Sequence, residues 1–206
     1  MIPQTIETKI LKRIRGRGQG WAFSAKDFAE VAGRSTVDSA LHRLAKRGSI
    51  RRVITGVYDL PVYSEHLRRA IASDVDQVAQ ALARKFGWQI QPSGPSAQNV
   101  LGLSTQVPSK FVYLSDGPKR MYRVGSTELA FQHTALKDAR FQFHESGLLV
   151  QAIKGLGPTS INSEAMKRMR AWLKPALRSR VRKDTQIVTG WVHDVIRQVT
   201  EDPTRG

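Results

Sequence analysis

The hydrophobic and polar positions of residues 35–47 follow a helical period. Val37, Ala40, Leu41 and Leu44 stand at i, i+3, i+4 and i+7, the spacing that brings side chains to one face of an α-helix. The opposite face is small and polar at its start and basic toward its end. Its members are Ser35, Ser39, His42 and Lys46. Such a face is typical of a solvated surface, and it also fits a groove of nucleic acid.

A basic amphipathic helix is predicted at the start of the chain. Ile6, Ile10 and Ile14 recur every four residues, and most of the positions between them are polar or basic. Three glycines within residues 16–20 end this helix, because glycine is costly inside a helix and favourable in a tight turn.

Two capping patterns follow. Ser24 and Asp27 have the spacing of a capping box, in which a serine and an acid exchange hydrogen bonds with free backbone amides, and they predict a second helix that closes at Gly33. Ser35 and Asp38 repeat the spacing and predict that Ser35 caps the helix over residues 35–47. Two short helices separated by a glycine-containing turn predict a helix-turn-helix, whose second helix normally reads DNA.

A small β-hairpin is predicted after Gly48. Its strands are residues 50–53 and 56–60, and the chain turns at residues 54–56. Arg51 and Arg52 are expected to project from this hairpin as a basic wing. Three helices followed by a hairpin predict a winged helix-turn-helix of about 60 residues, a size at which domains fold alone but marginally. A winged helix used only as a protein–protein module is the alternative.

The rest of the chain predicts a second domain and an α+β fold overall. We place the domains at residues 1–61 and 62–206, with a boundary region at 61–73 that includes a connecting helix over 66–72. The C-terminal domain has a mixed α/β part, 74–156, and a helical part, 157–200. A helix is predicted over 74–86, and short strands are predicted to form a small antiparallel sheet packed on it. The predicted strands are residues 88–91, 111–114, 122–124 and 129–132. The tail 202–206 is expected to be disordered.

The charge balance favours a polyanionic partner. The chain has 206 residues with a formal net charge of +16, which points first to DNA or RNA, then to an acidic protein or an anionic membrane. No apolar run approaches the ~20 residues of a membrane span, and the start lacks the apolar core of a signal peptide, so we expect a cytoplasmic protein without membrane association. The absence of cysteine excludes disulfides and thiol catalysis.

No enzyme, metal or cofactor is expected. The five histidines are scattered and have no metal-binding spacing. A metal-dependent nuclease using Asp116 and Glu128 is the competing enzymatic interpretation. Asp116 precedes Gly117 and Pro118, where turn formation explains it, and no lysine follows Glu128 to activate water.

The predicted DNA-binding residues divide into two groups. Ser35, Ser39, His42 and Lys46 face the major groove, where His42 and Lys46 can donate to guanine O6 and N7. The cations expected mainly at phosphates are Arg34, Arg43, Arg47, Arg51 and Arg52. Thr36 completes the set, whereas Asp38 is expected to cap its helix, because a carboxylate at the groove repels phosphates.

Four segments beyond the predicted winged helix carry a family resemblance. They are Val78–Arg84, Ile90–Gly94, Gly102–Pro108 and Tyr113–Pro118. With these segments, the chain resembles the AbiEi-type antitoxin family over about residues 21–156, closest to a compact branch. The resemblance implies an N-terminal winged helix, an α/β C-terminal domain, and a type IV antitoxin that represses its own operon.

Expected partners follow from the charge and from this resemblance. Double-stranded DNA of its own promoter, with inverted repeats, is the first. A nucleotidyltransferase-like toxin, without a stable complex, is the second and rests on the resemblance alone. A stand-alone nucleic-acid-binding regulator and a protein-interaction module remain alternatives. The basic helices over residues 167–183 are a further candidate surface for protein or nucleic acid.

Overall fold

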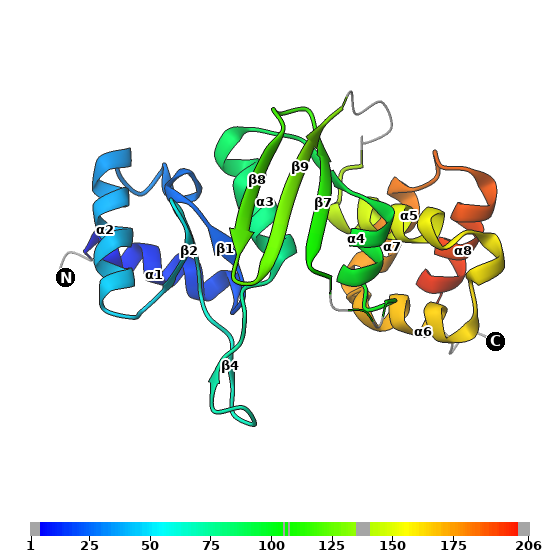
Figure 1. The fold of residues 1–206 in the computed structure, drawn as a ribbon, viewed down its shortest axis with the longest axis horizontal. Coiled ribbons are helices and arrows are strands. Elements are labelled where there is room, and N and C mark those ends of the chain that lie inside the picture. Colours follow the sequence, from blue (N-terminus) through cyan, green and yellow to red (C-terminus); the bar gives the residue numbers. More distant parts are fainter. Residues whose placement is uncertain (1–4, 105, 107, 135–140, 202–206) are drawn as a thin grey trace. The chain divides into compact units, whose positions relative to one another are not determined.

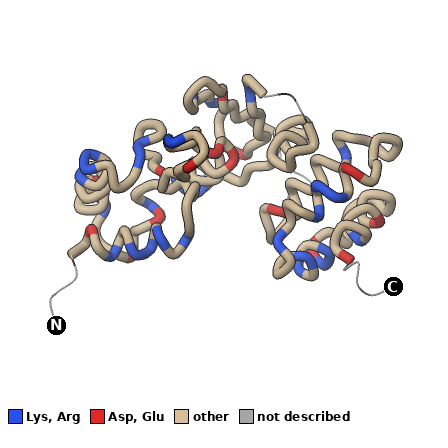
Figure 2. Tube along the Cα trace, turned by 90° about the horizontal axis from the view of Figure 1, so that it is seen from below, with Lys and Arg blue, Asp and Glu red and all other residues tan. Residues whose placement is uncertain are grey.

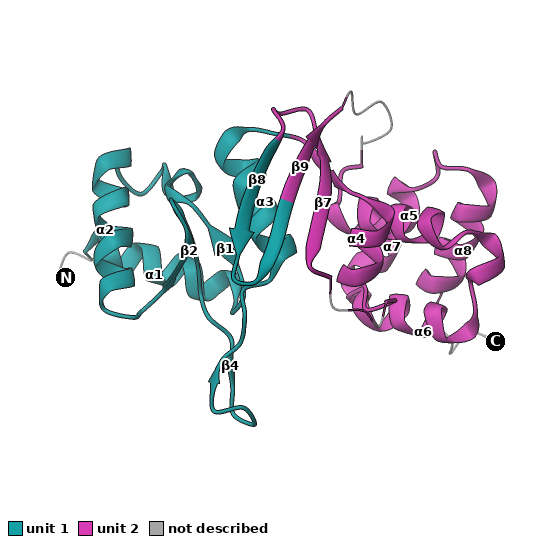
Figure 3. Ribbon diagram, in the orientation of Figure 1, with its two compact units in different colours: residues 1–88, 120–129 teal, residues 89–119, 130–206 magenta. Residues whose placement is uncertain are grey.

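The computed structural model of the chain describes residues 5–104, 106, 108–134 and 141–201. The fold is mixed α+β, with helices and small antiparallel sheets, as the sequence predicts (Figure 1). The chain divides into two compact units, which we call unit 1 (residues 1–88 and 120–129) and unit 2 (residues 89–119 and 130–206) (Figure 3). The tail predicted to be disordered lies outside the described residues.

Unit 1 starts with helices that enclose a small sheet. In chain order its first elements are α1 (Ile6–Arg17), β1 (Ala22–Phe23), the 3₁₀-helix η1 (Ala25–Phe28), α2 (Arg34–Lys46), β2 (Arg51–Ile54) and β3 (Val57–Asp59). The strands form an antiparallel sheet in the order β1-β3-β2, in which Tyr58 pairs with Phe23 on one side and Arg52 on the other. Ile10, Ile14 and Phe28 are fully buried in the core beneath this sheet.

The predicted second helix is wrong in type and length. The capping box at Ser24 forms, and the backbone N–H of Ser24 donates to Asp27 Oδ2 at 2.9 Å. Only one 3₁₀ turn follows, however, and Phe28 anchors it in the core. Fewer than ten residues separate the two caps, and a helix that short is stabilised by packing of its apolar side chains and not by propensity.

The predicted cap of the third helix is also wrong. α2 begins at Arg34 with Gly33 as its N-cap, so that Ser35 and Asp38 lie inside the helix. The extended backbone of Gly33 makes the break, and its carbonyl accepts the N–H of Val37 at 3.0 Å. No side chain caps this end of α2.

A β-hairpin replaces the predicted connecting helix over 66–72. β4 (Tyr63–Ser64) pairs antiparallel with β5 (Arg69–Ala70), and the hairpin extends away from the other elements of unit 1 (Figure 1). Ser64 Oγ accepts the N–H of Leu67 at 3.2 Å within the turn. Its exposed apolar side chains Tyr63 and Leu67 offer no core face, which a short helix needs for stability.

Unit 1 continues beyond the predicted boundary region. α3 (Val75–Phe86) starts at Asp74, whose side chain accepts the N–H of Asp76 at 2.9 Å, and ends at Gly87 in the left-handed conformation with φ 76°. α3 packs against β1, η1 and β3, so it belongs to the same compact unit as α2.

The predicted antiparallel sheet forms with four strands. Its order is β6-β7-β9-β8. The strands are β6 (Ile90–Pro92), β7 (Lys110–Ser115), β8 (Arg120–Val124) and β9 (Thr127–His133). β6 pairs antiparallel with β7, Ile90 opposite Ser115. The division between the units passes through this sheet at residues 129–130.

Unit 2 is mainly helical around a separate core. Its helices are α4 (Gly94–Val100), α5 (His144–Leu156), the 3₁₀-helix η2 (Pro158–Ser160), α6 (Ser163–Trp172), α7 (Pro175–Asp184) and α8 (Gly190–Thr200). Leu149, Met169 and Ile196 are fully buried in this core. Gly94 allows α4 to approach α5 closely, because a Cβ at Gly94 would lie 3.2 Å from the Cα of Gly155. Among the described helices, none is long and apolar enough to cross a membrane.

Candidate nucleic-acid interface

α2 has one buried face and one exposed face. Val37, Ala40, Leu41 and Leu44 are each 0% exposed and pack into the core of unit 1. The opposite face lies at the surface, as the helical period predicts. Its exposed members are Ser35, Ser39, His42 and Lys46, with Thr36 beside them. A polar face held by a fully buried stripe is a rigid platform for contacts with a partner.

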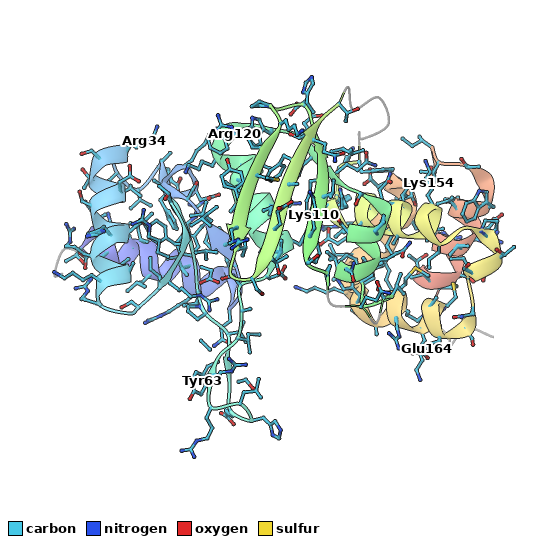
Figure 4. All side chains as sticks on the ribbon, in the orientation of Figure 1. Arg34, Tyr63, Lys110, Arg120, Lys154 and Glu164 are labelled. Atoms are coloured by element: carbon cyan, nitrogen blue, oxygen red, sulfur yellow. The ribbon has the colours of Figure 1, made fainter. Side chains whose placement is uncertain are left out.

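Four of the arginines predicted at phosphates, Arg34, Arg43, Arg47 and Arg52, are exposed, and Arg34 and Arg52 are the two that do not pair with Glu7. The side chain of Arg34 is 86% exposed at the start of α2 (Figure 4), and its ion pair with Asp38, one turn on, is long at 3.8 Å. Arg52 is exposed on β2. An exposed, loosely paired guanidinium is available to a phosphate.

Arg43 and Arg47 are held by a carboxylate from α1. Arg43 Nε donates to Glu7 Oε1 at 2.6 Å, and Arg47 Nη2 donates to Glu7 Oε2. The hydrogen bond from Arg43, then that from Arg47, lowers the pKa of Glu7 below its ordinary value. The stabilisation from these bonds is therefore complete above the ordinary glutamate pKa and is lost as pH falls through the lowered value. The structure brings both arginines to α2 as predicted, but it neutralises much of their charge.

This pairing predicts that Glu7 limits electrostatic binding to DNA. In Glu7→Gln, Arg43 and Arg47 are released, and we expect tighter binding to any duplex and a salt dependence steeper by about 1–2 in log Kd against log salt. Binding of one arbitrary duplex across a salt series measures the slope. Glu164→Gln makes the same charge change and releases Arg168 in unit 2. Equal steepening in both variants contradicts a role for Glu7 at α2.

The prediction that Arg51 projects as a basic wing is wrong. Arg51 Nε and Nη2 donate to the two carboxylate oxygens of Asp59 at 2.9 and 2.6 Å, and Nη1 donates to the carbonyl oxygen of Ile71 at 2.7 Å. Asp59 is 1% exposed and lies directly across the sheet from Arg51. All three guanidinium nitrogens are used in this way, so we treat Arg51 as a structural residue.

Sequence reasoning missed the cations that surround the start of α2. Lys26 of η1 and Lys85 of α3 line a hollow together with Arg34. Lys85 belongs to a helix assigned by its sequence to the other domain, and only the packing of α3 against β1 and η1 brings it here. Its position among the polar residues of α3 carried no signal of this role.

Asp116, a residue of the nuclease alternative, accepts a hydrogen bond from the backbone. Asp116 Oδ1 accepts the backbone N–H of Gln89 at 2.8 Å, which assigns it a structural role at the end of β7. Within the described ranges, no three side chains of His, Asp or Glu gather in a way that could hold a metal ion.

The fold and the exposed α2 face define an α+β protein with a candidate binding helix in unit 1. Residues 9–181 match the family described as "Family of unknown function (DUF6088)", and the chain belongs to this family. Among solved structures it is similar to the RV2827C protein from Mycobacterium tuberculosis, with 16% identity, a TM-score of 0.39, and coverage of 97% of this chain and 78% of that chain. No curated protein matches the chain.

Proposed function

We propose that unit 1 contains a winged helix-turn-helix that binds double-stranded DNA, with α2 as its reading helix. The observation that carries the proposal is the exposed polar and basic face of α2 above a stripe of fully buried side chains. The element order α1, η1, α2 and then the β2–β3 hairpin, with β1 as a third strand, supports this proposal, because a winged helix is expected to have helices followed by a hairpin. The single-turn η1 takes the place of the usual second helix.

The charge of the chain supports a nucleic-acid partner. Lys and Arg recur along the described trace (Figure 2). In the full sequence they outnumber Asp and Glu, 33 to 17. An excess of this size gives a long-range attraction to a polyanion and a strong dependence on salt.

Each α2 residue has a specific role in this proposal. Ser35, Ser39, His42 and Lys46 contact base edges, and Thr36 contacts the backbone at the groove edge. Arg34 and Arg52 bind phosphates, while Arg43 and Arg47 do so only when a phosphate displaces Glu7. Arg51 holds the hairpin in place.

We further propose that the protein represses its own promoter and acts as the antitoxin of a type IV toxin–antitoxin system. The resemblance to AbiEi-type antitoxins supports this biological role. Co-expression with a nucleotidyltransferase-like toxin encoded beside the gene tests it, because neutralisation restores growth of the host. A repressor without a paired toxin would bind its own promoter DNA but would not restore growth of the host.

The DNA proposal predicts different effects for a base contact and a phosphate contact. His42→Ala should reduce discrimination at one base pair by about 1–3 kcal/mol, whereas Arg52→Ala should weaken all sequences alike. Binding titrations on the upstream region of its own gene and on single-base variants of the bound site measure both effects. If His42→Ala lowers the affinity for all sequences equally, His42 does not contact a base. No mobility shift by the folded wild-type protein favours a protein-interaction module.

A further inference from the structure

A hollow of about 580 Å³ lies beside the start of α2, wholly within unit 1. Its walls come from η1, the first turn and a half of α2, the β2–β3 turn and α3. The charged or polar lining residues are Ser24, Lys26, Arg34, Asp38 and Lys85, and the others are alanines and glycines. This volume is within the range of small-molecule sites in proteins, about 300–1,000 Å³.

The charge of this hollow is positive and comes from three separate elements. Three cations, Lys26, Arg34 and Lys85, and one carboxylate, Asp38, give the lining a net charge of +2. The carboxylate of Asp38 offsets little of the charge of Arg34. The distance of 3.8 Å between Arg34 Nε and Asp38 Oδ2 is long for an ion pair between exposed groups.

Lys85 is held at the wall by the backbone of the β2–β3 turn. Its Nζ donates to the carbonyl oxygen of Thr55 at 3.2 Å. Gly56 has φ 72°, and a Cβ at this position would lie 2.6 Å from Lys85 Nζ, so the absence of a side chain leaves room for the ammonium group. Burial, and then the charge of Arg34, lowers the pKa of Lys85. A bound anion would offset both the cost of burying this charge and its repulsion by Arg34.

The start of α2 adds to the same potential. Gly33 lines the hollow and caps α2 without a side-chain acceptor, so the positive end of the helix dipole faces this region uncompensated. The helix end is a supplement here, since Lys26 and Lys85 belong to other elements.

We propose that this hollow is a binding site for a phosphate group. A phosphate monoester carries up to two negative charges and three terminal oxygens, which match a lining of charge +2 with donors on three walls. A carboxylate has one charge and two oxygens and leaves a cation unmatched. A phosphate of the DNA backbone also has one charge and two non-bridging oxygens, so the match favours a free phosphorylated small molecule, and a backbone phosphate is the other outcome of the test. Only the backbone outcome rests on the proposed function.

Titration of inorganic phosphate into the full chain, at constant ionic strength against chloride, tests the site directly. Amide resonances of Gly33, Arg34 and Gly56 should shift saturably, with a dissociation constant on the order of 1 mM. Lys85→Gln and Arg34→Gln should each weaken binding about tenfold or more, while Lys154→Gln, an exposed lysine of α5, should not. Unchanged spectra elsewhere verify that each variant is folded. A linear response, or binding that survives both pocket substitutions, overturns the proposal.

Two further arms identify the source of the phosphate. If a short duplex shifts the same amides and inorganic phosphate then has no effect, the site holds a backbone phosphate. If ribose 5-phosphate binds more tightly than inorganic phosphate and the duplex leaves these amides unmoved, the site takes a free phosphorylated molecule. A duplex that does not bind at all rejects the proposed function, while the result with inorganic phosphate still decides the pocket.

Discussion

Arg51→Met is expected to lower the free energy of unfolding of unit 1 by about 3–5 kcal/mol, the typical cost of leaving a buried charge without its partner. The substitution leaves the carboxylate of Asp59, which is 1% exposed, without its two hydrogen bonds from the guanidinium. The backbone carbonyl of Ile71 also loses a donor, so the start of the link to α3 should loosen. Native-state hydrogen exchange of the β2 and β3 amides measures the effect in unit 1 separately from unit 2.

Arg52→Met is the matched control, because it makes the same change one residue away on an exposed side chain. Its stability should stay within about 0.5 kcal/mol of wild type. The double variant Arg51→Met with Asp59→Leu removes both charges and should recover much of the loss. Equal stability of the Arg51 and Arg52 variants would show that the buried pair does not hold the hairpin.

Phe28→Ala is expected to destabilise unit 1 by a similar amount, about 3–5 kcal/mol. Phe28 is 0% exposed, and its ring packs edge-on against two other rings. Its centroid lies 5.5 Å from that of Phe23 and 6.1 Å from that of Trp21. The guanidinium of Arg13 lies over the same ring at 5.9 Å. Truncation opens a cavity among aromatic rings and removes the anchor of η1, which has only one turn to hold its position.

Phe86→Ala provides the comparison at an aromatic residue of the same unit. Phe86 is 39% exposed and stacks on Trp88 at 4.6 Å, so its loss should cost about 1 kcal/mol. Urea unfolding followed by exchange of the α2 amides compares the two variants. Similar losses would mean that Phe28 does not anchor η1 and α2.

The elements that were predicted correctly have strong local patterns. α2 and α3 carry apolar residues at helical spacing over three turns, and burial of that stripe dominates any weaker local preference. The β2–β3 hairpin turns at Thr55 and Gly56, as predicted, because glycine adopts the positive φ that the turn needs. Segments that failed, η1 and the β4–β5 hairpin, are short, and their apolar residues at helical spacing extend over fewer than three turns.

The sequence predicts which face of α2 is exposed, but it does not predict which charged side chains of the candidate site are paired. The period of α2 alone places His42 and Lys46 opposite Leu41 and Leu44, because helix geometry leaves no other arrangement once the apolar stripe is buried. Whether an arginine is free, however, depends on carboxylates far away in the sequence. Arg43 is paired with Glu7 from another helix, a contact to which no spacing in the chain points.

The α+β class, the register of α2 and the surplus of positive charge follow from local periodicity and composition, so they can be derived from the sequence alone. The tertiary structure sets which of the cations are paired. It pairs Arg51 of β2 with Asp59 of β3, and it places Lys85 of α3 next to the start of α2. The physical reason is that electrostatic partnership depends on distance in space, and packing of apolar faces sets those distances without regard to separation along the chain.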